Sequence, residues 1–83
     1  MFRIRTSSET ERELKKLKKI YELRIKQAIE DIKENPLIGK SLSRELTGRY
    51  SHRIGDYRII YTVSFKEKIV NIISVKHRSI AYQ

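Results

Sequence analysis

The sequence predicts an α+β fold: a small, twisted antiparallel sheet of about four strands with an N-terminal helical pair on one face. Two observations support this. The N-terminal half carries apolar residues at helical spacing, and the C-terminal half alternates apolar and polar residues between turn signals. The predicted order of elements is β-α-α-β-β-β. With 83 residues and no repeat or linker, the chain is expected to form one domain, residues 1–83, with a thin core.

The N-terminal half is predicted to begin with a strand and to continue as two helices. Residues 2–6 alternate apolar and polar side chains, and Ser8-Glu9-Thr10-Glu11 forms a capping box that opens a helix. Asn35-Pro36 ends the helical pattern. A single helix over residues 9–34 would be about 39 Å long, so we expect a break near residues 18–22. The apolar stripe expected to face the sheet comprises Leu14, Leu17, Ile20, Tyr21, Ile25, Ala28, Ile29 and Ile32.

The C-terminal half is predicted to hold three strands after a loop at residues 37–48. Turn residues and runs of β-formers place the strands at residues 50–54, 57–65 and 68–76. In the middle strand, alternate side chains share a face. The residues expected on its core face are Tyr57, Ile59, Tyr61, Val63 and Phe65.

A two-residue turn at Gly55-Asp56 fixes the register of the predicted hairpin. Ile54 then faces Tyr57, and Arg53 lies directly opposite Arg58. Two like charges at about 5 Å between Cβ atoms destabilise a hairpin. An anion held between two guanidinium groups would account for such a pair, whereas the alternative is two arginines that point into water.

The charge of the chain indicates a polyanionic partner. Nineteen Lys and Arg residues against ten Asp and Glu give a net charge of +9, and the excess is concentrated from Arg49 onward. Either nucleic acid or an acidic protein segment fits this charge. The absence of cysteine excludes disulfide frameworks and thiolate metal sites. Neither a membrane span nor a signal-peptide core is found in the sequence, so we expect a cytoplasmic protein.

The sequence resembles the RelE/ParE toxin superfamily of toxin–antitoxin systems over nearly its whole length. The resemblance lies in the opening strand, in Glu34-Asn35-Pro36 and in Leu46-Thr47-Gly48. Its most specific part is the pattern R-x-G-D-Y-R-x-x-Y over residues 53–61, followed by H-R-x-x-x-Y over residues 77–82. The fold of that superfamily matches the order of elements predicted above.

The resemblance implies a ribosome-dependent endoribonuclease that cleaves messenger RNA by attack of a ribose 2′-OH on the adjacent phosphate. Such a reaction needs a phosphate clamp, a proton acceptor and a group that assists the leaving 5′-oxygen. Arg58 falls on the phosphate-binding arginine of the family, and Arg53 on a basic position of the preceding strand. Arg78 and Tyr82 fall on the C-terminal arginine and tyrosine. The further positions considered for RNA binding are Arg49, Ser51, Lys76, Lys15 and Lys19.

Ser51 departs from the family pattern, which has a basic residue there. A serine without an assisting base is a poor proton acceptor at neutral pH, and a guanidinium group such as that of Arg53 has no acceptor atom. His77, His52 and Tyr82 are therefore the candidates for proton transfer. The mechanism requires neither metal nor cofactor.

Two alternatives to the ribonuclease stay open at this point. One is a gyrase-poisoning toxin of the ParE branch, and the other is a non-enzymatic or attenuated RNA-binding toxin. In every case the resemblance implies a cognate antitoxin, acidic and partly disordered when free, as a partner. The ribonuclease interpretation adds the ribosome and messenger RNA.

Overall fold

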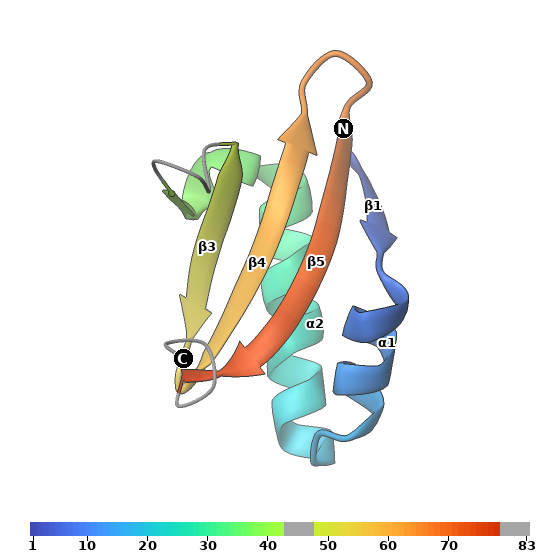
Figure 1. Cartoon of the computed structure of the whole chain (residues 1–83), viewed down its shortest axis with the longest axis vertical. Helices are drawn as coiled ribbons and strands as arrows, with labels where there is room; N and C mark the ends of the chain where they lie inside the picture. The colour runs from blue at the N-terminus through green and yellow to red at the C-terminus, as the bar shows by residue number, and fades with distance from the viewer. Residues whose placement is uncertain (43–47, 79–83) are drawn as a thin grey trace.

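The computed structural model describes residues 1–42 and 48–78, which form one sheet with helices packed against it (Figure 1). The helices are α1 (Ser8–Lys15) and α2 (Lys19–Glu34), and α2 is followed by the 3₁₀ turn η1 (Pro36–Ile38). The strands are β1 (Arg3–Thr6), β2 (Lys40–Ser41), β3 (Arg49–Ile54), β4 (Tyr57–Ser64) and β5 (Ile69–His77). The predicted α+β class and the order of its main elements are confirmed.

The sheet has the strand order β1-β5-β4-β3-β2. All neighbours are antiparallel except β1 and β5, which are parallel. Two details therefore differ from the prediction: the first strand pairs in parallel, and the segment predicted as a loop contains β2. Because β2 has only two residues, which pair with Tyr50 and Ser51, no run of β-formers could reveal it.

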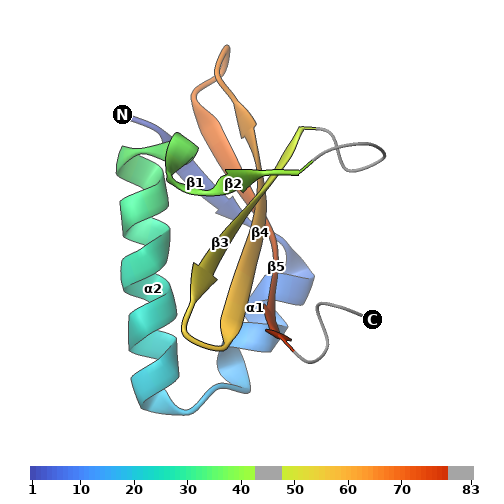
Figure 2. The same cartoon turned by 90° about the vertical axis from the view of Figure 1, so that its left-hand side faces the viewer.

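The two predicted helices are present, with the break at residues 16–18. Helix α2 covers one face of the sheet (Figure 2), whereas α1 lies beside β5, beyond the end of β1 (Figure 1). Ser7, not Ser8, caps α1 and accepts a hydrogen bond from the Thr10 amide at 3.0 Å. Neither of these helices is both long and apolar enough to span a bilayer.

Contacts with β5 explain both the cap and the position of α1. The Ser7 hydroxyl donates to the Ile73 carbonyl at 2.8 Å, and the buried Thr10 hydroxyl donates to the Ile72 carbonyl at 3.1 Å. These carbonyls lie where β1 has ended, so α1 supplies partners that a strand neighbour would otherwise supply. The tertiary contacts of Ser7 thus favour it over Ser8 as the cap.

The core lies between α2 and the sheet. The predicted apolar stripe of α2 is buried from Ile25 onward, and the sheet contributes Ile59, Tyr61, Val70, Ile72 and Val75. Three predicted core residues are exposed: Ile20 by 56%, Tyr21 by 40% and Phe65 by 52%. Ile20 lies in the first turn of a new helix, and Phe65 lies past the end of β4, where it packs edge-on against Phe2.

A β-bulge interrupts β5 at Ile73. Ile60 pairs with Ser74, whereas Tyr61 pairs with Ile72, so Ile73 is the extra residue on β5. Val70 and Ile72 face the core before the bulge, and Val75 faces it afterwards. The bulge therefore moves Ser74 and Lys76 to the face opposite α2.

Tyr61 connects the sheet to the segment after α2. Its hydroxyl donates to the Pro36 carbonyl at 2.7 Å and accepts from the Gly39 amide at 3.0 Å. A Cβ atom at Gly39 would collide with the Tyr61 side chain, so this close approach requires glycine. Burial raises the pKa of Tyr61 above its ordinary value.

We predict that Tyr61→Phe lowers the free energy of unfolding by about 1–3 kcal/mol, because it leaves the Pro36 carbonyl and the Gly39 amide without their partner. Urea unfolding measures this change. Tyr50→Phe is the matched control: Tyr50 stacks on Tyr61, but its hydroxyl bonds to no residue within the described ranges. Equal losses in the two variants would contradict the assigned role of the Tyr61 hydroxyl.

Candidate nucleic-acid interface

The β3–β4 hairpin has the predicted register. Gly55 begins the two-residue turn with φ +57°, a conformation that glycine adopts without strain. Ile54 pairs with Tyr57, and Arg53 pairs with Arg58. Ile59, the residue after Arg58 in β4, is buried against α2. Because side chains alternate along a strand, Arg58 and its partner Arg53 lie on the opposite face.

Lys76 of β5 extends this pair to three cations. It pairs with Arg58 across β4 and β5, so Arg53, Arg58 and Lys76 form a row over three neighbouring strands, here called the cation row. Arg53 is exposed and Arg58 is half-buried, with its Nε atom shut off from solvent. The sequence analysis considered Lys76 for RNA binding, but only the bulge places it in this row.

The rest of this sheet face contains a neutral row and a second basic region. Ser51, Ile60 and Ser74 pair side by side next to the cation row, and both serines are more than 90% buried. Ser51 therefore lies on the predicted face but is not freely exposed. The row beyond consists of paired positions on four strands: Arg5, Asn71, Thr62 and Arg49.

Arg49 lies on the predicted face, four residues of extended strand or about 13 Å from Arg53. Arg5, at the opposite end of the same row, was missed by the sequence analysis. The alternation of Arg3, Ile4 and Arg5 is the signal that could have indicated it, since Ile4 packs on the core. Both Arg5 and Arg49 are exposed.

Arg78 lies at the hairpin turn. Its backbone amide donates to the Asp56 carbonyl at 2.7 Å, and its guanidinium lies 3.9 Å from the Asp56 carboxylate. The structure thus brings Arg78 to the end of the sheet that carries the cation row.

His77 is not brought to the arginines. It pairs with Tyr57 on the α2 side of the sheet, where the two rings meet edge to face at 5.4 Å. Tyr57 in turn packs against Tyr21 of α2, with ring centroids 5.6 Å apart. His52 also faces the α2 side, opposite Ile59. Tyr82 lies outside the described residues.

The remaining predicted positions lie away from the sheet face. Lys15 ends α1 and Lys19 begins α2, and both are exposed. Among the described residues, no three His, Asp or Glu side chains gather as they would around a metal ion.

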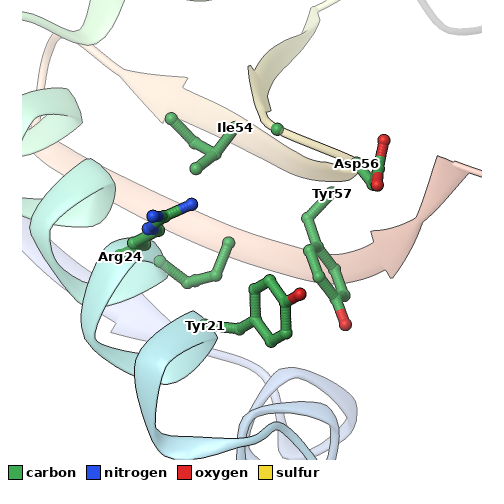
Figure 3. Close-up of a pocket in the computed structure, with 7 residues that line it drawn as sticks. Tyr21, Arg24, Ile54, Asp56 and Tyr57 are labelled. Carbon is green, nitrogen blue, oxygen red and sulfur yellow. The ribbon is translucent and has the colours of Figure 1, made fainter.

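A small pocket lies behind the hairpin, between its turn and α2 (Figure 3). The rings of Tyr21 and Tyr57 and the side chain of Arg24 border it. Its volume of about 30 Å³ is roughly a tenth of what a small-molecule site usually offers, so the open sheet face is the better nucleic-acid site.

The Lys76 end of the cation row is in contact with helix α1. Lys76 is held by two carboxylates of α1: Glu13 at 2.6 Å and Glu9 at 3.9 Å. The hydrogen bond with Glu13 raises the pKa of Lys76 above its ordinary value, so Lys76 stays protonated at neutral pH. Lys76 thus adds a third cation to the row, and the two α1 carboxylates partly compensate its charge.

Comparisons with known proteins identify the family. A family model described as the ParE toxin of the type II toxin–antitoxin system parDE matches residues 4–82. Toxin RelG of Mycobacterium tuberculosis is 34% identical over 84 residues, which cover 99% of this chain and 97% of that protein.

Solved structures agree with this assignment. The toxin–antitoxin complex RelBE2 of Mycobacterium tuberculosis contains a chain that matches with a TM-score of 0.85 at 34% identity, covering 93% of this chain and 98% of that chain. A chain of the archaeal RelE–RelB complex of Pyrococcus horikoshii matches with a TM-score of 0.77 at 26% identity, covering 93% of this chain and 94% of that chain. The chain belongs to the ParE toxin family of type II toxin–antitoxin systems, within the RelE/ParE superfamily.

Proposed function

We propose that this toxin is a ribosome-dependent endoribonuclease that cleaves messenger RNA in the cytoplasm and so inhibits translation. The observation that carries the proposal is the cation row of Arg53, Arg58 and Lys76 on the open sheet face. Direct opposition of like charges opposes folding. The same arrangement suits a phosphate group, because guanidinium and ammonium groups make charge-assisted hydrogen bonds to its oxygens.

In the proposed reaction the ribose 2′-oxygen forms a bond to the adjacent phosphorus while the bond to the 5′-oxygen breaks. The 2′-hydroxyl loses its proton, the 5′-oxygen gains one, and the products carry a 2′,3′-cyclic phosphate and a 5′-hydroxyl. Arg58, at the centre of the row, would hold the non-bridging oxygens as negative charge develops on them. Arg53 and Lys76 flank it, and no metal or other cofactor takes part.

The proton acceptor is proposed to come from the C-terminal segment. His77 and His52 both lie on the α2 side of the sheet. A serine such as Ser51 is a weak base without assistance. Tyr82 is therefore the member of the predicted set to which we assign proton transfer or orientation of a base.

The second basic region supports an extended path for the RNA. Arg49 and Arg5 lie beyond the neutral row, on the same face as Arg58. A strand of RNA with one phosphate at Arg58 could place a phosphate further along the strand near Arg49. Lys15 and Lys19 are proposed to make less specific contacts with ribosomal RNA.

The antitoxin is proposed to bind the outer surface of α2. Leu23 and Ile20 are each 56% exposed there, and a groove on this helix is lined by Leu23, Lys26, Gln27, Ile29 and Glu30. Exposed apolar side chains beside cations suit an acidic, amphipathic segment. The matched RelBE2 and RelE–RelB structures are toxin–antitoxin complexes.

The gyrase-poisoning alternative has one observation in its favour, since the matching family model bears the ParE name. The 34% identity to RelG over 99% of the chain favours the RelE branch. Induced expression with primer-extension mapping separates the two. Codon-phased cuts in translated regions support the ribonuclease, DNA breaks with an SOS response support the gyrase poison, and neither signal supports an attenuated RNA-binding toxin.

We predict that Arg58→Ala lowers the rate of RNA cleavage by about 10²- to 10³-fold and abolishes toxicity, because it removes the central charge that stabilises the transition state. The domain should stay folded by circular dichroism, since the change also relieves repulsion from Arg53 and Lys76. Arg24→Ala, which removes an exposed arginine from α2, is the control and should keep full activity. Growth arrest by Arg58→Ala at wild-type strength would refute the assignment.

We predict that Ser51→Lys increases ribosome-dependent cleavage, because it adds a cation beside Arg53 where the family pattern has one. Ser51 is only 8% exposed, so the lysine side chain must extend past its neighbours to reach solvent. The variant will therefore lose more stability than a lysine substitution at an exposed position would cost. Cleavage rates per folded molecule are the measurement. An unchanged or lower rate in a folded variant would mean that position 51 plays no part in the chemistry.

A further inference from the structure

Glu13 of α1 makes two short hydrogen bonds to β5. One carboxylate oxygen, Oε1, accepts from the backbone amide of Val75 at 2.7 Å. The other, Oε2, accepts from the Lys76 ammonium at 2.6 Å. The Glu13 side chain is only 18% exposed, and that of Lys76 is 35% exposed. One carboxylate thus fixes both the backbone and a side chain of two successive residues.

These bonds act where β5 lacks a strand neighbour on its outer edge. Strand β1 pairs with β5 only as far as Ile72, and the bulge at Ile73 follows directly. A bulge bends a strand and increases its twist. Beyond it, β5 has hydrogen bonds to β4 but no strand on its other side to orient its side chains. The Val75 amide bonds to Glu13 in place of a strand.

Lys76 also needs an opposing charge to stay in the cation row. It lies next to Arg58, which lies next to Arg53, and like charges at cross-strand distance repel. Glu13 compensates this repulsion from the outer edge of β5 and gives the flexible lysine one fixed position. Glu9 is a weaker counter-charge, at 3.9 Å and with an exposed side chain.

We propose that Glu13 is a positioning residue, which fixes the Lys76 ammonium at the β5 end of the cation row, so that a phosphate group at Arg58 meets a neighbouring cation that is already ordered. This inference rests on the proposed ribonuclease function, because its benefit lies in the cleavage step. Charge that is already in place stabilises a transition state without further reorganisation, whereas a mobile lysine must first be ordered.

Glu13→Gln is the decisive variant. Glutamine keeps an acceptor for the Val75 amide, but its neutral side chain no longer holds Lys76. We expect kcat for ribosome-dependent cleavage to fall by about 10- to 100-fold. KM should stay the same or fall, because a lost negative charge does not weaken RNA binding.

Glu9→Gln is the matched control, since it removes the same charge from the same helix without a short contact to Lys76. Its kcat should stay within about twofold of wild type. In the Glu13→Gln background, Lys76→Gln should cause little additional loss, because the two residues act as a unit.

A measurement without RNA separates this inference from the proposed function. The pKa of the Lys76 ammonium, followed by NMR in the isolated protein, should fall toward its ordinary value in Glu13→Gln but not in Glu9→Gln. If the wild-type toxin cleaves no RNA, the proposed function fails and this titration alone decides whether Glu13 holds Lys76. The inference would be overturned if Glu13→Gln left the Lys76 pKa or kcat unchanged. It would also be overturned if Glu13→Gln and Glu9→Gln lost equal activity, or if a smaller folded fraction explained the loss in Glu13→Gln.

Discussion

Three cations lie in one row at the hairpin end of the sheet, and their repulsion is the constraint that the surrounding structure must overcome. Arg53, Arg58 and Lys76 are fixed as direct neighbours by the register of β3, β4 and β5. That register is set from the opposite face, where α2 and the sheet bury a continuous apolar core around Tyr61. Burial of each large apolar side chain contributes about 1.5–3 kcal/mol, which exceeds the few tenths to 1 kcal/mol of one opposed like-charge pair. The core therefore keeps the three cationic residues in neighbouring positions.

The hairpin half of this row could be predicted from the sequence, but the β5 half could not. Gly55-Asp56 is a two-residue turn, and strands have a period of two, so the pairing of Arg53 with Arg58 follows. Strict alternation along β5 from the buried Val70 would place Lys76 on the core face and His77 on the arginine face. The bulge at Ile73 exchanges the two. Nothing local in the sequence marks this bulge, since Ile73 is an ordinary β-former without a glycine beside it.

In the N-terminal half, too, features set by neighbouring residues could be predicted, whereas features set by distant parts of the chain could not. Helical spacing and Asn35-Pro36 were enough to predict the buried stripe of α2 and its end. The cap at Ser7 and the parallel pairing of β1 were not predictable, because they depend on carbonyl groups of β5 that lie more than 60 residues further along the chain. Glu13 belongs to the second class. In the sequence it is one of several glutamates on a charged helix, and only the fold brings it to Val75 and Lys76.

The structure shows which residue can compensate for Ser51, which stands where the family pattern has a basic residue. The family pattern places a second cation on β3, whereas this chain has a buried, neutral position there, paired with Ile60 and in line with Ser74. The third positive charge comes instead from β5, through Lys76 and its carboxylate partner on α1. In the proposed reaction this arrangement can replace the charge that a lysine at position 51 would supply to the phosphate. It cannot replace a proton acceptor, because guanidinium groups have no acceptor atom and Glu13 stabilises the protonated form of Lys76. In the proposed reaction, charge stabilisation is therefore assigned to the sheet, and proton transfer to Tyr82.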